Sequence, residues 1–178
     1  MEALDVSIDS DADGAGAASQ QLLRFALGDD AYGAPIDRIR EILEVPPTTE
    51  MPRMPSFVLG VMNLRGAVVP VIDLGARFGL AATRIGRRSC VIVVDSSTEP
   101  TNGSARQPLG LLVDAVHEVL DIDAGALAPA PSLGTRIAPE FIAAVTRARD
   151  QLLTIIDLDR ALNSDDLAQL ISAEAAHA

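Results

Sequence analysis

The chain has 178 residues, enough for one ordinary domain or two small lobes, and it can fold without a metal or a disulfide. Its aromatic residues are four Phe and one Tyr, all 14 basic residues are Arg, and 25 acids give a formal net charge of −11. This charge argues against nucleic-acid binding, which needs phosphate-neutralising side chains and usually stacking aromatics. The single cysteine, Cys90, excludes a disulfide framework or a cysteine zinc cluster.

The first 19 residues contain five acids and no base. This is the reverse of a signal peptide and predicts a disordered acidic tail over residues 1–19. The longest apolar stretch, residues 57–74, is interrupted by Asn63 and Arg65, so it does not indicate a membrane-spanning helix. We therefore expect a cytoplasmic protein with no direct membrane insertion.

From residue 20 onward, short apolar runs alternate with turn residues. An alternating run over residues 23–27 is followed by a turn at residues 28–30. Further Val- and Ile-rich runs of five to eight residues predict strands, because helices would be longer; they occupy residues 67–72, 90–94, 109–113 and 151–156. Connections of helical length are missing, which favours small antiparallel barrels or a sandwich over a parallel sheet. Pro70 inside one run predicts an edge strand or a bulge.

Two other segments differ from this strand pattern. Residues 95–108 are polar and predict a variable loop. Residues 163–176 have a capping Asn163 or Ser164 and an apolar face, which predicts a C-terminal helix within a final segment 163–178. The globular part is therefore expected over residues 20–162.

An internal repeat is the most informative feature. Residues 55–74 match residues 139–158 without a gap at seven of twenty positions, and residues 32–43 match residues 109–120 in the same order. The repeat predicts two pseudo-equivalent lobes, about 20–80 and 87–162, with terminal strands open to exchange between them.

Candidate catalytic groups do not form a convincing constellation. Asp73 and Asp157 recur at the ends of matching strands, which favours helix caps over paired catalytic carboxylates. His117 replaces Arg40 of the first lobe and is interpreted as a surface position; a small hydrolase using His117 with Asp114 or Glu118 stays as the alternative from another class. The scattered His and Cys residues predict no metal site, and without Lys no phosphate-binding P-loop can form, so no cofactor is expected.

Arg65 in the segment GVMNLRG needs either solvent or a carboxylate, because burying an unpaired charge is costly. Glu41 is its predicted partner, and the matching pair of the second lobe is Glu118 with Arg149. The residues leave two interpretations open: a structural ion pair repeated by duplication, or a charged fork presented to another protein.

The same residues carry a resemblance to a known family. The segments LLRFALGDDAYGAPIDRIREIL, GVMNLRGAVVPVIDL and GLLVDAVHEVL resemble CheW, the chemotaxis coupling protein, over about residues 20–162. The resemblance implies an all-β fold with short helices, in which two pseudo-symmetric, intertwined, five-stranded SH3-like β-barrels precede the C-terminal helix. It also implies no catalysis and no cofactor. The implied function is an adaptor that couples the cytoplasmic tip of chemoreceptors to the regulatory domain of the histidine kinase CheA, recruited to membrane-bound arrays and able to self-associate in rings.

Carried onto this chain, the family pattern makes Arg65 and Glu41 the signalling-critical charges. Ile39 and Ile42 are expected at the surface that meets the kinase. The receptor tip is expected in a groove near Asn63, Leu64 and Val113, with Gly66 completing the motif. The second lobe has Arg147 and Asp150 in place of Asn63 and Gly66, so its face need not have the same role. The acidic tail and the polar loop leave open a specialised array that controls type IV pili or a second-messenger output.

Overall fold

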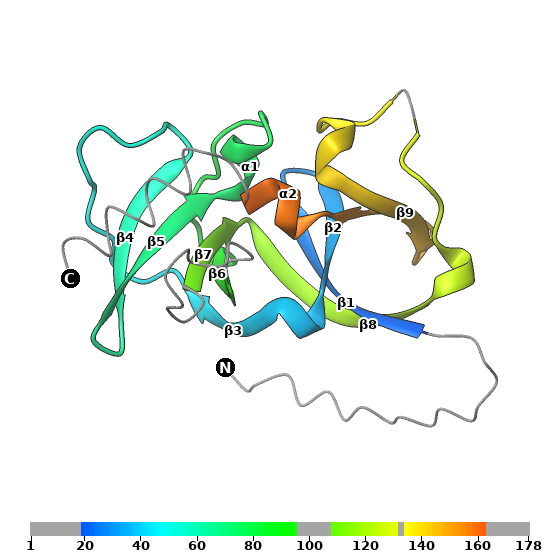
Figure 1. Cartoon of the computed structure of the whole chain (residues 1–178), viewed down its shortest axis with the longest axis horizontal. Helices are drawn as coiled ribbons and strands as arrows, with labels where there is room; N and C mark the ends of the chain where they lie inside the picture. The colour runs from blue at the N-terminus through cyan, green and yellow to red at the C-terminus, as the bar shows by residue number, and fades with distance from the viewer. Residues whose placement is uncertain (1–18, 96–107, 132–133, 163–178) are drawn as a thin grey trace, which may run out of the picture.

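The computed structural model describes residues 19–95, 108–131 and 134–162. Ten strands in these ranges form two five-stranded sheets that lie side by side (Figure 1). The predicted acidic tail, most of the predicted polar loop and the predicted C-terminal helix lie outside the described residues. No helix in the described part of the chain combines the length and apolarity that a membrane crossing requires.

Sheet A and sheet B are built from the same succession of strands. Sheet A runs β8 (Ala115–Asp123), β1 (Ser19–Leu27), β2 (Asp30–Pro35), β10 (Gln151–Ile156) and β9 (Ile142–Ala148). Sheet B runs β3 (Ile39–Glu44), β6 (Cys90–Asp95), β7 (Pro108–Val113), β5 (Ala67–Asp73) and β4 (Val58–Leu64). Exchanging every two strands whose numbers differ by five, such as β1 with β6 and β8 with β3, converts one order into the other. The two halves of the sequence are therefore intertwined, because each sheet takes strands from both.

The helical elements are short and lie between strands. They are α1 (Leu74–Arg77), α2 (Leu158–Leu162) and the 3₁₀ turns η1 (Ile36–Arg38), η2 (Ala124–Ala126) and η3 (Pro139–Phe141). Asp73 caps α1 by accepting a hydrogen bond from the Ala76 amide at 3.3 Å. Asp157 accepts one from the Arg160 amide at 3.1 Å, at the matching position of α2. Both carboxylates are helix caps, as the repeat predicted.

The duplication extends to local irregularities. The β4–β5 ladder shifts register between Val58 and Gly60, and the β9–β10 ladder shifts at the matching place, where Ala144 pairs with Ile155 and Ile142 with Ile156. The edges of the two ladders also carry matching bridges, Thr49 with Val61 and Ala128 with Val145. The sequence repeat thus reports a true structural repeat rather than a chance alignment.

Pro70 lies in an interior strand, so of the two expected alternatives, an edge strand or a bulge, the edge strand is wrong. The nearest register shift of the β4–β5 ladder lies between Val58 and Gly60, whereas Pro70 itself pairs with Val61. β5 is flanked by β4 on one side and β7 on the other. The parallel ladder with β7 begins only at Val71, one residue after the proline. Pro70 therefore sits beside the start of that ladder, where its missing amide proton costs no sheet hydrogen bond.

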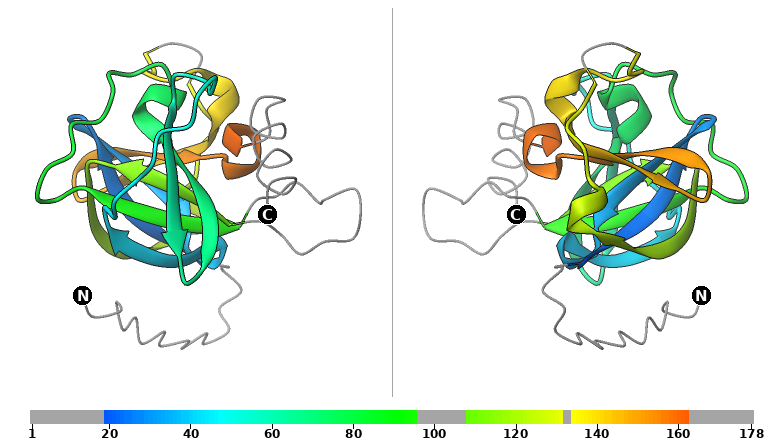
Figure 2. Two further views of the ribbon diagram at one scale, coloured as in Figure 1. Left: turned by 90° about the vertical axis from the view of Figure 1, so that its left-hand side faces the viewer. Right: turned by 90° about the vertical axis from the view of Figure 1, so that its right-hand side faces the viewer.

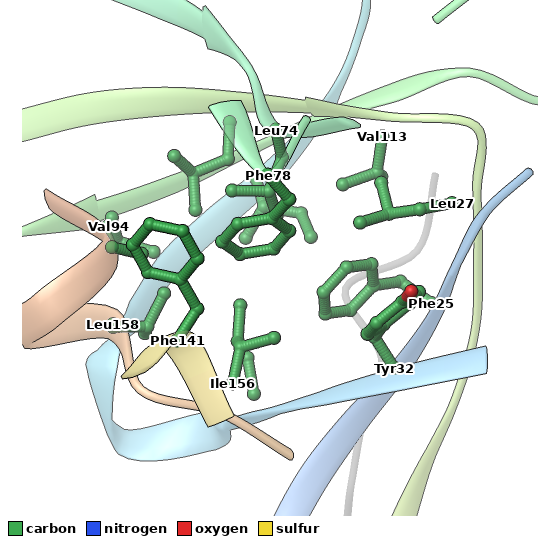
Figure 3. Close-up of a cluster of buried hydrophobic side chains, with 14 of the residues drawn as sticks. Phe25, Leu27, Tyr32, Leu74, Phe78, Val94, Val113, Phe141, Ile156 and Leu158 are labelled. Atoms are coloured by element: carbon green, nitrogen blue, oxygen red, sulfur yellow. The ribbon is translucent and has the colours of Figure 1, made fainter. Parts of the chain in front are cut away.

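Three apolar clusters hold the sheets together. Each sheet curls around its own small core as an open SH3-like barrel, one around Met62 and Val91, the other around Leu22 and Leu153 (Figure 2). A larger core, which we call the inter-barrel core, is formed by side chains of both sheets together with the α1 and α2 segments (Figure 3). Burial of these mainly aliphatic side chains supplies the main stabilisation.

The five aromatic side chains gather in and around the inter-barrel core. Phe25 and Tyr32 stack at 6.1 Å between ring centroids, and Phe78 and Phe141 meet at 5.1 Å (Figure 3). The Arg77 guanidinium lies over the Phe141 ring at 4.9 Å and over the remaining aromatic, Phe57, at 5.2 Å. Burial, reinforced by nearby Asp30, raises the pKa of Tyr32 to about 12, so this phenol stays protonated in the core.

Candidate functional site

Arg65 occupies the tip of the β4–β5 hairpin. Arg65 and Gly66 both have left-handed backbone angles, φ 52° and 87°, which fit the two-residue type I′ turn that joins twisted antiparallel strands. The Asn63 side-chain oxygen accepts a hydrogen bond from the Gly66 amide at 3.0 Å and fixes the turn. The motif therefore presents the arginine on a defined hairpin rather than on an irregular loop.

The Arg65 guanidinium forms a bidentate ion pair with Glu41. Its Nη1 and Nη2 donate to the two carboxylate oxygens of Glu41 at 2.6 and 2.9 Å. β3 and β4 are the opposite edges of sheet B, so this pair links the two edges across the open seam of the barrel. The hydrogen bond from Arg65 is the main cause that lowers the pKa of Glu41 below 4.5. The Arg65 side chain remains 73% exposed, whereas Glu41 is 24% exposed.

The matching pair of sheet A has a different environment. Arg149 Nη2 lies 2.6 Å from Glu118 Oε1, and the second oxygen of Glu118 contacts Arg24 Nη1 at 3.2 Å. Arg24 also donates to the Gln151 side-chain oxygen at 2.8 Å. The Arg149 turn repeats the hairpin geometry, with φ of 51° at Arg149 and 62° at Asp150. Both predicted ion pairs are thus present, but among the described residues only the pair in sheet A is part of a larger network.

A bulge in β3 decides where Ile39 and Ile42 point. The register with β6 shifts between Ile39 and Glu41, so the two isoleucines, three residues apart, face the same side. Both are partly buried and pack against the inter-barrel core. They therefore contribute part of their surface to packing and leave the remainder at the sheet edge, because β3 has no strand on its outer side among the described residues.

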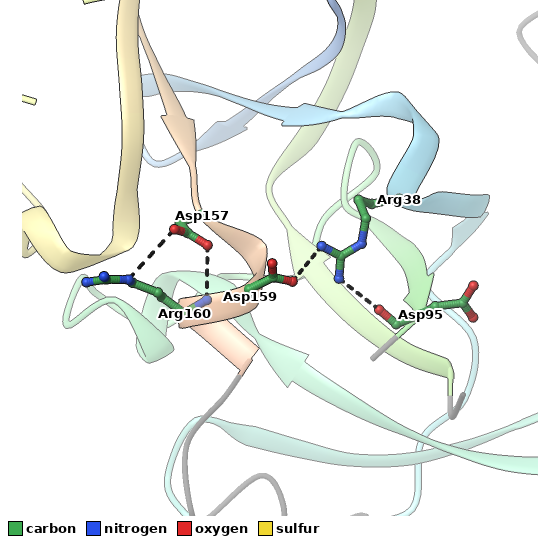
Figure 4. Close-up of polar contacts among 5 residues, drawn as sticks. All are labelled: Arg38, Asp95, Asp157, Asp159 and Arg160. Atoms are coloured by element: carbon green, nitrogen blue, oxygen red, sulfur yellow. Dashed lines mark hydrogen bonds and ion pairs between the residues drawn. The ribbon is translucent and has the colours of Figure 1, made fainter. Parts of the chain in front are cut away.

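Arg38 anchors the start of β3. Its Nη1 donates to Asp159 of α2 at 2.7 Å, and its Nη2 donates to the main-chain oxygen of Asp95 at the end of β6 at 3.2 Å (Figure 4). Arg40 also contacts Asp95, through an ion pair of 3.3 Å with the Asp95 carboxylate. These bonds fix the position of β3, and with it the positions of Ile39 and Glu41.

The remaining predicted site residues do not all reach the surface. Asn63 and Gly66 are exposed, and Leu64 is partly buried against the core of sheet B. Val113 has 0% exposed surface and lies inside the inter-barrel core (Figure 3). The prediction that Val113 lies in the receptor groove is therefore wrong. It is an apolar residue at the end of a central strand and packs inward, so it offers no surface to a partner.

Sequence reasoning missed Val68 as a surface residue. It pairs with Asn63 across the β4–β5 hairpin and is 51% exposed. Leu152, its counterpart in the repeat, pairs with Arg147 and is 55% exposed. The continuous apolar run over residues 67–72 concealed the exposure of Val68. The signal that could have revealed this exposure was the pairing of Val68 with the polar Asn63 on the neighbouring strand.

The groups of the hydrolase hypothesis are engaged elsewhere. Asp114 accepts a hydrogen bond from the Gly28 amide at 2.6 Å, and Glu118 is held by two arginines. Partial burial, with Arg24 and Arg88 nearby, lowers the pKa of His117 below 6.5. Within the described ranges, no three His, Cys, Asp or Glu side chains are placed to hold a metal ion.

Comparisons with known proteins agree with the fold. The CheW-like domain family matches residues 21–166. Chemotaxis protein CheW of Rhizobium meliloti is 32% identical over 147 residues, covering 83% of this chain and 90% of the relative, and that of Klebsiella aerogenes is 29% identical over 158 residues, covering 89% and 90%. The crystal structure of the scaffolding protein TtCheW from Thermoanaerobacter tengcongensis has a TM-score of 0.72 at 32% identity, covering 84% of this chain and 96% of that one.

These similarities decide between the adaptor and the hydrolase. The hydrolase hypothesis is wrong, because the matched family and the matched scaffolding structure are those of non-enzymatic adaptors. The chain belongs to the CheW family and is a non-enzymatic scaffold protein of chemotaxis signalling.

Proposed function

We propose that this chain couples chemoreceptors to the histidine kinase CheA, in the cytoplasm, at receptor arrays to which it is recruited. The observation that carries the proposal is the exposed guanidinium of Arg65, held in a fixed orientation by Glu41 at 2.6 and 2.9 Å. An exposed ion pair contributes little to folding stability. An arginine fork whose orientation is already fixed is, however, well suited to contact a partner protein.

The kinase regulatory domain is proposed to dock along β3. Ile39 and Ile42 supply partly exposed apolar surface, and Glu41 lies between them on the same strand. The contacts of Arg38 hold this strand against β6 and α2, so its edge is ordered in the unbound protein. A small interface that combines apolar and charged groups is typical of transient signalling complexes.

The receptor tip is proposed to contact the β4–β5 hairpin. Asn63, Leu64 and Gly66 shape the hairpin, and we add Val68, whose half-exposed side chain lies opposite Asn63. Val113 is left out because it is buried. We call the exposed part of residues 63–68 together with Glu41 the hairpin surface.

Self-association in rings is proposed to use the duplication. The two barrels present hairpins of the same geometry but different side chains, with Asn63 and Gly66 on one and Arg147 and Asp150 on the other. Two similar but non-identical faces favour head-to-tail contacts, which close into rings when the rotation permits. One face of the chain could then bind a second copy or the kinase while the other face stays available.

A bridging assay tests the proposal. Receptor cytoplasmic fragments attached to vesicles are sedimented with the kinase regulatory domain, with and without this chain. The adaptor function predicts that the kinase domain sediments only when the chain is present, and that the chain itself sediments with the receptor alone. If the chain sediments with neither protein, the proposed coupling is contradicted.

A further inference from the structure

The loop that leads into β6 carries an exposed basic cluster. Arg84, Arg87 and Arg88 are all exposed, and none of them forms an ion pair with another described residue. Between them Ile85 is 54% exposed, one of the most exposed large apolar side chains described. We call residues 84–88 the arginine loop; it projects from the side of the molecule (Figure 2, left).

Ser89 holds the arginine loop in a defined turn. Its side chain is buried, and its oxygen accepts a hydrogen bond from the Gly86 amide at 2.8 Å. The Ser89 amide donates in return to the Gly86 carbonyl at 3.2 Å. The loop is therefore ordered before any ligand binds, which lowers the entropic cost of recognition.

Nearby acids compensate only part of this positive charge. Asp29, Asp30 and Asp114 line the same hollow as Arg84. Asp30 is paired with Arg136 at 3.0 Å, whereas the Asp114 carboxylate accepts a hydrogen bond from the uncharged Gly28 amide at 2.6 Å and keeps its negative charge. Asp29 and Asp114 therefore offset two of the three loop arginines, which leaves an excess of one positive charge at the loop. A local excess of positive charge in a chain of net charge −11 indicates a site for an acidic segment.

The chain itself contains a matching acidic segment. Residues 1–18 carry five acids and no base, and their apolar residues Leu4, Val6 and Ile8 alternate with polar ones. Such a segment offers carboxylates to the three arginines and an apolar side chain to Ile85. Because it is covalently attached, its effective concentration at the loop is on the order of millimolar.

The attachment point lies within reach of the loop. Ser19, where the described chain begins, pairs with Asp123 at the end of β8. Arg88 lines a hollow together with His117, six residues back along that strand. Six strand residues span about 20 Å. Eighteen extended residues span up to about 60 Å, so the segment can reach the loop with length to spare.

We propose that the arginine loop is a docking site for an acidic peptide segment and that residues 1–18 of the same chain are its resident occupant. The contact is electrostatic, so it weakens as salt screens it. An acidic segment of another protein would compete with residues 1–18 for the same three arginines. This inference does not depend on the proposed coupling of receptor to kinase.

Paramagnetic relaxation in the full chain tests the proposal. A spin label is attached at Ser10→Cys in a Cys90→Ser background, and the broadening of the backbone amides of residues 84–88 is measured by NMR. We expect the relaxation enhancement at an ionic strength of about 0.02 M to exceed by about fivefold that at about 1 M, where the Debye length falls to about 3 Å. Unlabelled spectra of each variant show that the fold is retained.

A charge-matched pair of variants gives the control. Arg84→Gln with Arg88→Gln should remove most of the broadening. Arg53→Gln with Arg147→Gln changes the net charge equally at exposed arginines outside the loop and should preserve it. Absence of broadening at low salt, or equal broadening in the two double variants, would overturn the proposal. If the two double variants abolish the broadening equally, the attraction depends only on overall charge and the docking site is rejected.

Discussion

The Arg65 guanidinium and the Glu41 carboxylate join the two opposite edges of sheet B through a bidentate contact of 2.6 and 2.9 Å. The matching carboxylate of sheet A, Glu118, divides its oxygens between Arg149 and Arg24. The same edge-to-edge connection therefore exists twice, once as an exposed pair and once as a network. This asymmetry suggests that duplication kept the geometry in both barrels while the roles of the two pairs diverged.

Replacing Glu118 should destabilise the protein more than replacing Glu41. Glu118→Ala leaves the Arg24 side chain, which is only 16% exposed, without its carboxylate. We expect a loss of about 1–3 kcal/mol in the free energy of unfolding, measured by urea denaturation. Glu41→Ala is the matched control and should lower the free energy of unfolding by less, because its partner Arg65 is solvated. An equal loss in both variants would contradict a different role for the two pairs.

Gly110 should tolerate no side chain, whereas its counterpart Gly33 should. A Cβ at Gly110 would lie 2.8 Å from Val91 Cγ1 and 3.2 Å from Met62 Cε, inside the core of sheet B. At Gly33 the nearest atom, Leu153 Cδ2, is at an ordinary 3.4 Å. Gly110→Ala should lower the free energy of unfolding by about 1–3 kcal/mol. Chemical denaturation of both alanine variants checks this, and a larger loss for Gly33→Ala would be inconsistent with the packing.

Val68 should contribute to receptor binding without supporting the fold. Val68→Ser removes apolar surface from a side chain that is 51% exposed beside Asn63. Loss of this contact should weaken binding to a receptor cytoplasmic fragment about fivefold while leaving the melting temperature nearly unchanged. Titration calorimetry and thermal denaturation measure the two effects. Leu152→Ser makes the same kind of change on the other barrel, and a comparable loss of receptor binding there would argue against the hairpin surface.

The Arg65–Glu41 pair should persist into mildly acidic solution. Arg65 lowers the pKa of Glu41 in the folded protein below 4.5, the usual value that applies in the unfolded chain. The stabilisation it gives is therefore fully present above pH 4.5 and is lost as pH falls through the lowered folded value. A ¹³C NMR titration of the Glu41 carboxyl should show a midpoint below 4.5 that moves back upward in Arg65→Gln. A midpoint that does not move in this variant would show that Arg65 is not the cause.

Much of the fold followed from the repeat. Matching Arg65 with Arg149, and Glu41 with Glu118, predicted both ion pairs before any strand was placed. The exchange of strands was left open, because sequence order alone does not tell which half supplies the neighbour of a strand. The parallel pairings of β2 with β10 and of β5 with β7 are contacts over long sequence separation, and no local pattern reports them.

The errors at the site have local physical causes. Val113 was taken as a surface residue by resemblance, but its strand lies in the middle of sheet B and its side chain packs between the barrels. Pro70 was assigned to an edge strand or a bulge, because the rule for prolines concerns a hydrogen-bonded ladder and the sequence did not show where the ladder with β7 begins. Ile39 and Ile42 share one face only through a bulge, which alternation patterns do not reveal.

The most direct test of the account compares Arg65→Ala with Arg149→Ala in binding to the kinase regulatory domain and to a receptor fragment, by titration calorimetry. Each variant removes an exposed arginine with a left-handed backbone from the equivalent turn of its own hairpin, so the change in charge and backbone strain is matched. The account predicts that Arg65→Ala weakens binding to at least one of these partners about tenfold or more, with an almost unchanged melting temperature, while Arg149→Ala leaves both affinities near the wild-type values. If Arg65→Ala melts much earlier while binding both partners normally, the pair is structural and the proposed signalling role of Arg65 is contradicted.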